Sequence, residues 1–417
     1  MTPEIKQRIE QIRRGEVPER YVKTALGLAP TDWKRYTFGD IYTERKEPGD
    51  ENLPLLMVSI HSGVSDGEVD AAELPKQVKR IEDKSQYKKA VSGDLVFNMM
   101  RAWQGAIGTV RTTGMVSPAY IVAEPNDKAY PLFMDYYSRT PQMINQLDRQ
   151  SYGVTDFRKR LYWDSFAPIG CILPPIEEQQ KIATILTTQD RVIELKEKRL
   201  AEKQRQKKYL MQQLLTGKKR LPGFNGAWKV DRLGKLFLER KETNCENIEM
   251  LAITGTQGII PRKELDLKDN SSEDKSKYLR VCVGDIGYNT MRMWQGVSAY
   301  SNYEGIVSPA YTILKPVADI DAKYFSYLFK LPETVFLFYR FSQGLVDDTR
   351  NLKYENFKKI TVRYPSDRRE QTAIAKVLST ADREIDLLRQ DIDQEKQKKK
   401  ALMQLLLTGI VRVTPCH

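Results

Sequence analysis

Two stretches of the chain carry apolar residues at a spacing of seven positions, which is typical of long helices that pack along their length. The first stretch spans residues 177–216, and the second ends near Leu406. The positions are spaced 4, 7, 7, 7 and 7, and one in each stretch is a lysine. The seam of the first is Ile182, Leu186, Ile193, Leu200, Lys207 and Leu214, and that of the second is Ile374, Leu378, Ile385, Ile392, Lys399 and Leu406. The pattern predicts two helices of about forty residues, each about 60 Å long.

Proline and glycine mark the ends of these helices. Pro174-Pro175 precedes Glu177-Glu178 at the first start. Proline fits the first helical turn, and carboxylates favour the positive end of the helix dipole. Gly217 and Gly409 follow the two final turns, as expected for C-terminal caps.

Short apolar runs separated by Gly, Pro and Asp predict strands and turns before the first long helix. These runs are 53–60, 94–100, 106–110, 119–123 and 168–173. Residues 131–150 instead have helical spacing, with a break expected at Pro141. Together they predict an α/β unit.

The plan of this unit occurs twice. GDLVFNMMRAWQG (93–105) recurs as GDIGYNTMRMWQG (284–296), and VSPAY (116–120) recurs at 307–311, each 191 positions later. An ungapped match of this kind indicates a tandem duplication. Between the matching blocks the residues differ, so one scaffold with two sets of loops predicts two related but unequal targets.

The N-terminal residues 4–14 predict a short basic helix that stops at Gly15. Its Ile9, Ile12 and Gly15 have the spacing of Met211, Leu214 and Gly217 at the end of the first long helix. The order is therefore helix end, globule, helix, globule, helix. Such a chain is nearly circular, and two like halves related by a pseudo-twofold axis would set the long helices antiparallel.

Composition narrows the class of partner. The 417 residues carry a formal net charge of +12 and are 41% hydrophobic and 29% charged, as in a soluble globular protein that binds a polyanion. Charge alone leaves open a merely soluble basic surface. No run is apolar enough for a membrane span or a signal peptide, which favours the cytoplasm. Four scattered cysteines and two histidines argue against a zinc site or a disulfide framework.

Catalytic motifs are missing from the sequence. It has no GxxxxGK[ST], GxGxxG, GxSxG or HExxH pattern, and no N-P-P-[FY] element of an adenine methyltransferase. Glu194-Leu195-Lys196 matches the tail of a nuclease signature, but its place on the heptad helix favours a solvated charged face. The chain is therefore expected to be non-catalytic, with no metal and no cofactor of its own.

The repeated blocks, followed by LPPIEEQQKIATIL (173–186) and a helix that leaves through LLTG, resemble the specificity subunit of type I restriction-modification systems. The resemblance covers essentially the whole chain. It implies an α+β fold in which two similar α/β target-recognition domains are separated by two long antiparallel helices that form a coiled coil in a pseudo-twofold, circular arrangement. The expected segments are 1–29 (partial helix and lead-in), 30–173 (first recognition domain), 174–220 (central helix), 221–365 (second recognition domain) and 366–417 (C-terminal helix).

The resemblance also implies function and partners. Each domain would bind one half of a split target in double-stranded DNA, and the helices would space the domains and dock two modification subunits. Those subunits bring S-adenosylmethionine and the methyl transfer, and motor-nuclease restriction subunits join around them. A coiled-coil adaptor whose heads bind proteins, and a self-sufficient enzyme, are the other two hypotheses.

Four segments supply the expected DNA contacts, because lysine and arginine bind phosphates and polar loop residues read base edges. In the first domain they are Ser59, His61 and Ser62; Lys84, Lys88 and Lys89; Arg101 and Gln104; and Arg158, Lys159 and Arg160. In the second domain they are Thr254, Thr256 and Gln257; Lys275 and Lys277; Arg292 and Gln295; and Arg350 and Lys353.

The alternatives differ between segments. The shared motif suits a structural or phosphate-binding role better than base reading, and Trp103 and Trp294 within it are expected in the core. The cations after the glycine-bearing loops are the better DNA candidates, against a solvated surface. His61 has an inert role as its equal alternative.

Overall fold

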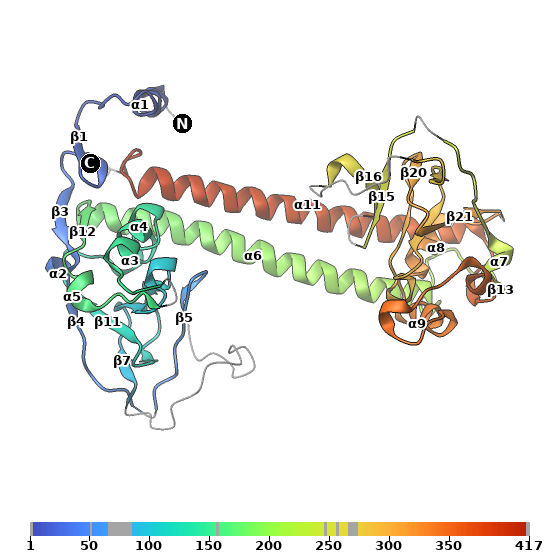
Figure 1. Cartoon of the computed structure of the whole chain (residues 1–417), viewed down its shortest axis with the longest axis horizontal. Helices are drawn as coiled ribbons and strands as arrows, with labels where there is room; N and C mark the ends of the chain where they lie inside the picture. The colour runs from blue at the N-terminus through green and yellow to red at the C-terminus, as the bar shows by residue number, and fades with distance from the viewer. Residues whose placement is uncertain are drawn as a thin grey trace. The chain divides into compact units, whose positions relative to one another are not determined.

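The computed structural model describes residues 3–50, 52–65, 86–155, 158–245, 248–255, 258–265, 274–317 and 319–413. The chain divides into two compact units, which are unit 1 (Met1–Leu195 with Ile392–His417) and unit 2 (Lys196–Asp391). Each long helix contributes one part to unit 1 and the other part to unit 2. Helices and strands are both present in each unit, which confirms the α+β class (Figure 1).

Unit 1 is built on an antiparallel sheet of order β4-β11-β8-β9. These strands are Tyr42–Glu44, Tyr120–Pro125, Leu95–Asn98 and Ile107–Thr109. Helices α3 (Pro131–Tyr137) and α4 (Pro141–Gln150) follow the sheet, which confirms the break at Pro141. Among the described residues, the other elements ahead of the long helices are α1 (Pro3–Arg13), β1 (Tyr21–Thr24), β2 (Gly27–Pro30), β3 (Lys34–Thr37), α2 (Phe38–Ile41), β5 (Val58–Ser59), β6 (Gly63–Val64), β7 (Lys88–Ala90), the 3-10 turn η2 (Ala102–Gln104), β10 (Gly114–Val116), α5 (Trp163–Phe166) and β12 (Gly170–Leu173).

Unit 2 repeats this sheet in the order β14-β21-β18-β19. These strands are Phe237–Glu239, Tyr311–Pro316, Ile286–Asn289 and Ser298–Tyr300, and the helices α8 (Ala322–Leu328) and α9 (Pro332–Phe341) follow. The other described elements are β13 (Trp228–Arg232), α7 (Leu233–Leu236), β15 (Leu251–Thr254), β16 (Gly258–Pro261), η4 (Arg262–Glu264), β17 (Leu279–Val281), η5 (Met293–Gln295), β20 (Gly305–Val307), η6 (Asp347–Thr349), α10 (Tyr354–Phe357) and β22 (Thr361–Pro365).

Both faces of each central sheet are buried, which explains the continuous apolar runs in the sequence. In unit 1, Leu95 and Phe97 of β8 pack into the core that contains the helices, while Val96 packs against β5, β6, β7 and β10. In unit 2 the position of Val96 is taken by Gly287. A Cβ there would lie 2.3 Å from Ile253 Cδ1, so only glycine leaves room for that side chain.

The run 53–60 is predicted as one strand, and this prediction is wrong for most of its length. Only Val58–Ser59 forms a strand, while Leu55 makes an isolated bridge with Met115. Pro54 lacks an N–H, and its carbonyl accepts from Met115 N at 2.9 Å. A proline inside the run therefore shortens the strand.

The long helices are α6 (Ile176–Leu215) and α11 (Arg368–Leu406), and they pair antiparallel within each unit (Figure 1). In unit 1, Gln189 Nε2 donates to Glu395 Oε2 at 2.6 Å. In unit 2, Lys203 Nζ lies 2.7 Å from Glu384 Oε2, and Lys196 Nζ lies 2.8 Å from Asp391 Oδ1. The two predicted long helices and their packing are confirmed. No helix among the described residues has the length and apolar character that a membrane span requires.

The two seam lysines join both helices to the α/β part of their unit. Lys399 lies 2.5 Å from Asp190, whose other oxygen accepts from the Tyr136 hydroxyl at 2.6 Å. In unit 2, Lys207 binds Asp382, which accepts from the Tyr327 hydroxyl at 2.7 Å. Burial and the neighbouring aspartate raise the pKa of both tyrosines above its ordinary value, so they remain neutral donors.

The two ends of the chain meet within unit 1. Tyr21 donates its hydroxyl proton to the Gly409 carbonyl at 2.7 Å, and Arg8 of α1 donates to the Ile410 carbonyl at 3.1 Å. Arg412 then binds the buried Glu178 at the start of α6, at 2.8 Å. Unit 1 thus requires the residues that follow α11, as the nearly circular order predicts.

The same clamp occurs in unit 2, where Arg220 follows α6 and binds Glu370 at the start of α11. The two hydrogen bonds, from Nε and Nη2, are 2.5 and 2.6 Å long. Arg220 and Arg412 occupy matching places after Gly217 and Gly409, both of which adopt positive φ as expected of helix caps. The helix-end repeat is therefore a docking element for the unit beside it.

Candidate nucleic-acid interface

The Gly-Asp pair of the repeated motif has a structural function. In unit 1, the Asp94 carboxylate accepts hydrogen bonds from Arg45 Nε at 2.8 Å and Nη2 at 3.2 Å, and from the Val91 backbone N at 2.8 Å. The hydrogen bonds to Asp94 raise the pKa of the Arg45 guanidinium above its ordinary value. The Arg45–Asp94 ion pair joins the end of β4 to the turn before β8.

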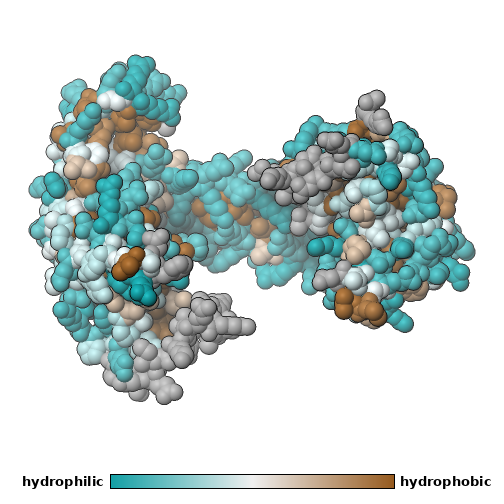
Figure 2. Space-filling view, in the orientation of Figure 1, coloured by the Kyte–Doolittle hydropathy of each residue, from teal (hydrophilic) through white to brown (hydrophobic). Residues whose placement is uncertain are grey.

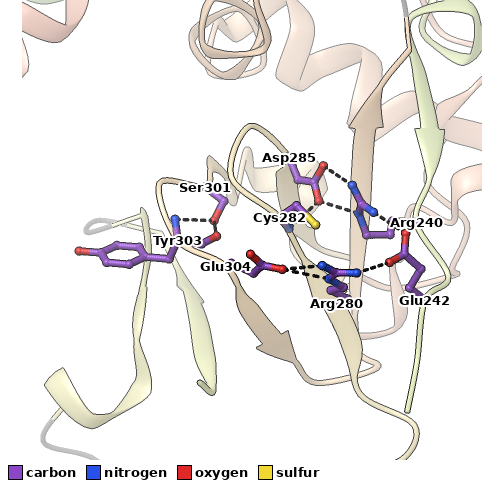
Figure 3. Close-up of polar contacts among 8 residues, drawn as sticks. All are labelled: Arg240, Glu242, Arg280, Cys282, Asp285, Ser301, Tyr303 and Glu304. Carbon is purple, nitrogen blue, oxygen red and sulfur yellow. Dashed lines mark hydrogen bonds and ion pairs between the residues drawn. The ribbon is translucent and has the colours of Figure 1, made fainter. Parts of the chain in front are cut away.

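Figure 3 shows the counterpart in unit 2, where Arg240 makes two hydrogen bonds to Asp285, at 2.8 and 3.1 Å. Glu242 bridges Arg240 to Arg280, which also binds Glu304 at 2.6 Å. Carboxylates surround both guanidinium groups, so these arginines are held by the protein and are poor candidates for phosphate contact.

The second half of the motif forms a tight exposed turn. Gly105 ends η2 with φ of 99°, a left-handed conformation that favours glycine. Trp103 Nε1 donates to the Met100 carbonyl at 3.0 Å, while the Arg101 and Gln104 side chains are exposed. The counterparts in unit 2 are Met291, Arg292, Trp294, Gln295 and Gly296. There, Trp294 Nε1 donates to the Met291 carbonyl at 2.9 Å.

Trp103 and Trp294 are partly exposed rather than in the core, which corrects the expectation from the sequence. Lys159 Nζ lies 5.1 Å from the centre of the Trp103 ring, and Arg350 lies 6.0 Å from that of Trp294. A cation over an indole face is attracted by the negative face of the ring. Each tryptophan therefore supports the cation of the glycine-bearing loop, which sequence reasoning missed.

Paired backbone groups close the glycine-bearing loop in each unit. In unit 2, Gln343 and Asn351 exchange two N–H···O bonds of 2.8 and 2.7 Å, and in unit 1 Tyr152 and Arg160 exchange two of 3.1 and 3.0 Å. The loop base also bonds to the motif strand, because Leu352 N donates to the Thr290 carbonyl at 2.9 Å. The loop and the motif turn are thus one continuous surface.

A third segment lies beside this turn. In unit 1, a Cβ built on Gly105 would lie 3.7 Å from the Ile60 carbonyl, which belongs to the tip between β5 and β6. In unit 2, a Cβ on Gly255, between β15 and β16, would lie 4.0 Å from Val297 Cγ2. The hairpin tip, the motif turn and the glycine-bearing loop therefore converge in each unit.

The predicted residues fall into three groups. Arg101, Gln104, Arg158, His61, Ser62, Lys277, Arg292, Gln295 and Lys353 are exposed. Ser59, Lys88, Lys89, Lys159, Arg160, Thr254, Lys275 and Arg350 are partly buried. Lys84, Thr256 and Gln257 lie outside the described residues.

Several of the partly buried residues have partners within the protein. Lys89 and Lys159 are paired with Glu47 and Asp148, at 3.0 and 2.8 Å. Lys88 donates to the Tyr120 carbonyl at 2.8 Å, and burial lowers the pKa of Lys88. These three lysines therefore make contacts within the protein that stabilise its fold. Their predicted contacts with DNA remain predictions.

Arg350 is held by several groups of its own unit. Its guanidinium lies 4.1 Å from the Tyr339 ring centre, and its side chain is 15% exposed. It also donates to Asp347 Oδ1 and to the Tyr339 hydroxyl, each at 3.3 Å. By contrast, no hydrogen bond or ion pair joins the Arg101 or Arg292 side chain to any part of the chain that the structure describes. The motif arginines Arg101 and Arg292 therefore supply free positive charge at the convergent surface.

The described residues contain no group of three or more His, Cys, Asp or Glu placed to hold a metal ion. The convergent surface instead combines exposed cations, an exposed glutamine and polar hairpin residues. Such a set can bind phosphates through charge and base edges through hydrogen bonds.

Known proteins resemble the chain over nearly its whole length. A protein of Methanocaldococcus jannaschii, named for the specificity subunit of type I restriction enzyme MjaX, is 24% identical in an alignment of length 438, which covers 95% of this chain and 97% of the relative. The solved S subunit of a type I restriction-modification system from M. genitalium matches with a TM-score of 0.55 and 12% identity, over 90% of this chain and 96% of that one.

A chain from a structure that describes complex assembly and conformational transition of the type I R-M system matches with a TM-score of 0.52 and 17% identity, over 92% of this chain and 99% of that one. These two structures support the fold. The family model described as the type I restriction modification DNA specificity domain matches residues 70–205 and 232–396, one segment for each repeat. Those segments make up more than half of the chain, so the protein belongs to the type I restriction modification DNA specificity family.

Proposed function

We propose that this protein is the DNA sequence-recognition subunit of a type I restriction-modification complex, and that each unit binds one half of a bipartite target. The observation that carries the proposal is the repeated convergent surface. Both units present a motif turn with a free arginine and an exposed glutamine, beside loops of different sequence. The shared arginines and glutamines suit contacts that both half-sites offer, such as phosphates, and the differing loops suit different bases.

The helices α6 and α11 act as the spacer in this proposal. An α-helix of 40 residues is about 60 Å long, which exceeds one turn of B-DNA. A stiff antiparallel pair would fix the distance between two half-sites, so half-site spacing would be a property of the helices. Their charged outer faces would dock two modification subunits.

The chemistry belongs to the partners in this proposal. S-adenosylmethionine and adenine methylation would come from the modification subunits, and restriction subunits would supply DNA cleavage. The chain itself offers DNA positioning, and the absence of known catalytic motifs from its sequence agrees with that division.

The test combines this chain with the modification subunit of the same restriction-modification system. We expect the complex, supplied with S-adenosylmethionine, to methylate adenines within one split motif of host genomic DNA. The chain alone should leave the same DNA unmethylated. Methylation or cleavage by the chain alone would identify a self-sufficient enzyme instead.

Salt dependence separates the proposal from a protein-binding adaptor. Binding through phosphate contacts releases counterions from DNA, and this release is less favourable when the salt concentration in solution is higher. The affinity therefore falls steeply as salt rises from about 50 to about 200 mM. We expect this behaviour with duplex DNA. Binding to a protein partner alone, insensitive to salt, would support the adaptor.

A further inference from the structure

The two most exposed large apolar side chains of the described chain occupy equivalent positions. Val154 in unit 1 is 91% exposed and Leu345 in unit 2 is 100% exposed, whereas the next values are 62%. They lie 191 positions apart, at the offset of the repeated motif, and each directly follows the glycine of its loop. Most of the residues that follow them differ between the loops, so the shared apolar residue stands out.

The support beneath each apolar residue is narrow and well anchored. Gly344 has φ of +136°, and a Cβ there would lie 2.7 Å from Arg350 Cα, so the two sides of the loop touch. A Cβ on Gly153 would likewise lie 2.4 Å from the Arg158 carbonyl oxygen. With the paired backbone groups and the stacked cation at its base, the loop holds its apolar residue at the tip of a small projection.

Exposed cations surround the base of this projection. Lys353 follows the loop in unit 2, and the free Arg292 belongs to the turn on which the loop rests. In unit 1 the exposed cations are Arg101, which matches Arg292, and Arg158, which belongs to the loop itself. Figure 2 shows a brown patch on unit 2 where Figure 1 draws α9, the helix that leads into the loop. An apolar tip among cations matches a duplex, which offers phosphates at its rim and bases within its grooves.

Single exposed apolar residues are common on soluble proteins and need no explanation. Here, however, the exposure is close to complete, occurs twice at one structural position, and lies on the surface proposed to face DNA. The apolar group that a base pair presents in the major groove is the thymine methyl. We propose, on the basis of the proposed function, that Leu345 and Val154 each enter the major groove and contact a thymine 5-methyl group in the half-site of their own unit.

The experiment uses the complex of this chain with its modification subunits and a duplex that contains the methylated site. Each thymine of the site is replaced in turn by deoxyuridine, which removes only the methyl group. We expect the unmodified protein to lose about fourfold in affinity at one position in each half-site, the factor that one buried methyl-sized group gives. The Leu345→Ser variant should lose the discrimination in one half-site, and Val154→Ser should lose it in the other.

Val283→Ser is the matched control, because Val283 is 62% exposed in unit 2 but precedes β18, whereas the motif turn follows that strand. It should discriminate as the unmodified protein does. The salt dependence of binding should be unchanged in all three variants, since no charge is removed.

Two results would overturn the inference. The first is a Leu345→Ser variant that still discriminates thymine from deoxyuridine at every position. The second is a variant that binds more weakly by the same factor with and without the methyl group, as expected of a base-step wedge. A protein that binds no duplex in a salt-dependent manner would instead refute the proposed function itself.

Discussion

The glycine-bearing loops of the two units show how one scaffold carries two different surfaces. In unit 1, Lys159 lies over Trp103 and pairs with Asp148 of α4 at 2.8 Å. In unit 2, Arg350 takes the same place but is held by two aromatic rings and by Asp347 within the loop itself. The tryptophan platform and the closing backbone pairs are shared. The duplication therefore preserves the anchor of the loop while its contents vary.

A second comparison concerns the clamps at the helix starts. Glu178 of unit 1 accepts from Arg412 and also from Val413 N at 3.1 Å and Trp33 Nε1 at 3.3 Å. Glu370 of unit 2 is buried and accepts from Arg220, while the buried Trp228 Nε1 finds no acceptor among the described residues. Among the residues that the structure describes, three donate to the Glu178 carboxylate, whereas only Arg220 donates to that of Glu370.

The largest expected effect follows from this difference. Arg220→Ala should destabilise unit 2 by about 3 kcal/mol, because it leaves a buried carboxylate without its partner. Arg412→Ala should cost unit 1 about 2 kcal/mol, since two of the donors to Glu178 remain. Amide hydrogen exchange, followed separately for peptides of each unit, measures both values.

Arg369→Ala is the control for this pair, because Arg369 pairs with Asp367 near the same helix start but is 86% exposed. Its effect on the stability of unit 2 should be close to neutral, because the ion pair is exposed to solvent. Equal losses in Arg220→Ala and Arg412→Ala would contradict the account of unequal clamps.

A smaller and equal effect is expected where the units are alike. Tyr136→Phe and Tyr327→Phe each remove one hydrogen bond to an aspartate that a seam lysine also binds. Each should cost about 1.5 kcal/mol, measured by the same exchange experiment. Tyr209→Phe, at an exposed position of α6, should be neutral. If one tyrosine proved neutral and the other did not, the two lysine clusters would not be equivalent.

The smallest effect separates free from held cations. Arg292→Ala should lower the slope of log affinity against log salt by about one, because the exposed guanidinium would bind a phosphate. Arg350→Ala should lower the affinity for DNA, because the loop loses its anchor. It should change the slope of log affinity against log salt less than Arg292→Ala does. Titration of duplex DNA at several salt concentrations checks both. A greater loss of slope in Arg350→Ala would mean that the stacked arginine leaves its rings to bind DNA.

Sequence patterns predicted the periodic parts of this fold. The long helices, their seams, the break at Pro141 and the duplicated sheet follow from apolar spacing and from proline and glycine, which act locally. The strand at 53–60 was overpredicted because the Pro54 carbonyl and the Leu56 N–H bond to the backbone of Met115, a contact that no local pattern reveals.

The candidate surface was only partly predictable. The motif turn and the glycine-bearing loop were identified as separate segments, but their contact depends on Lys159 and Arg350 reaching tryptophans more than fifty positions earlier in the chain. Tyr339 and the apolar tips Val154 and Leu345 were missed, since each is ordinary in the sequence. A signal for the tips was present in the sequence: each apolar residue directly follows its loop glycine, and the two residues are separated by the repeat offset of 191 positions.

The central claim is that each unit specifies one half of a split DNA target. Its most direct test replaces residues 33–173 with the first recognition domain of another family member and maps methylated adenines in the host genome by single-molecule sequencing. The account predicts a bipartite motif in which one half changes and the other half and the spacing are retained. A motif that changes in both halves, or that does not change at all, would contradict it.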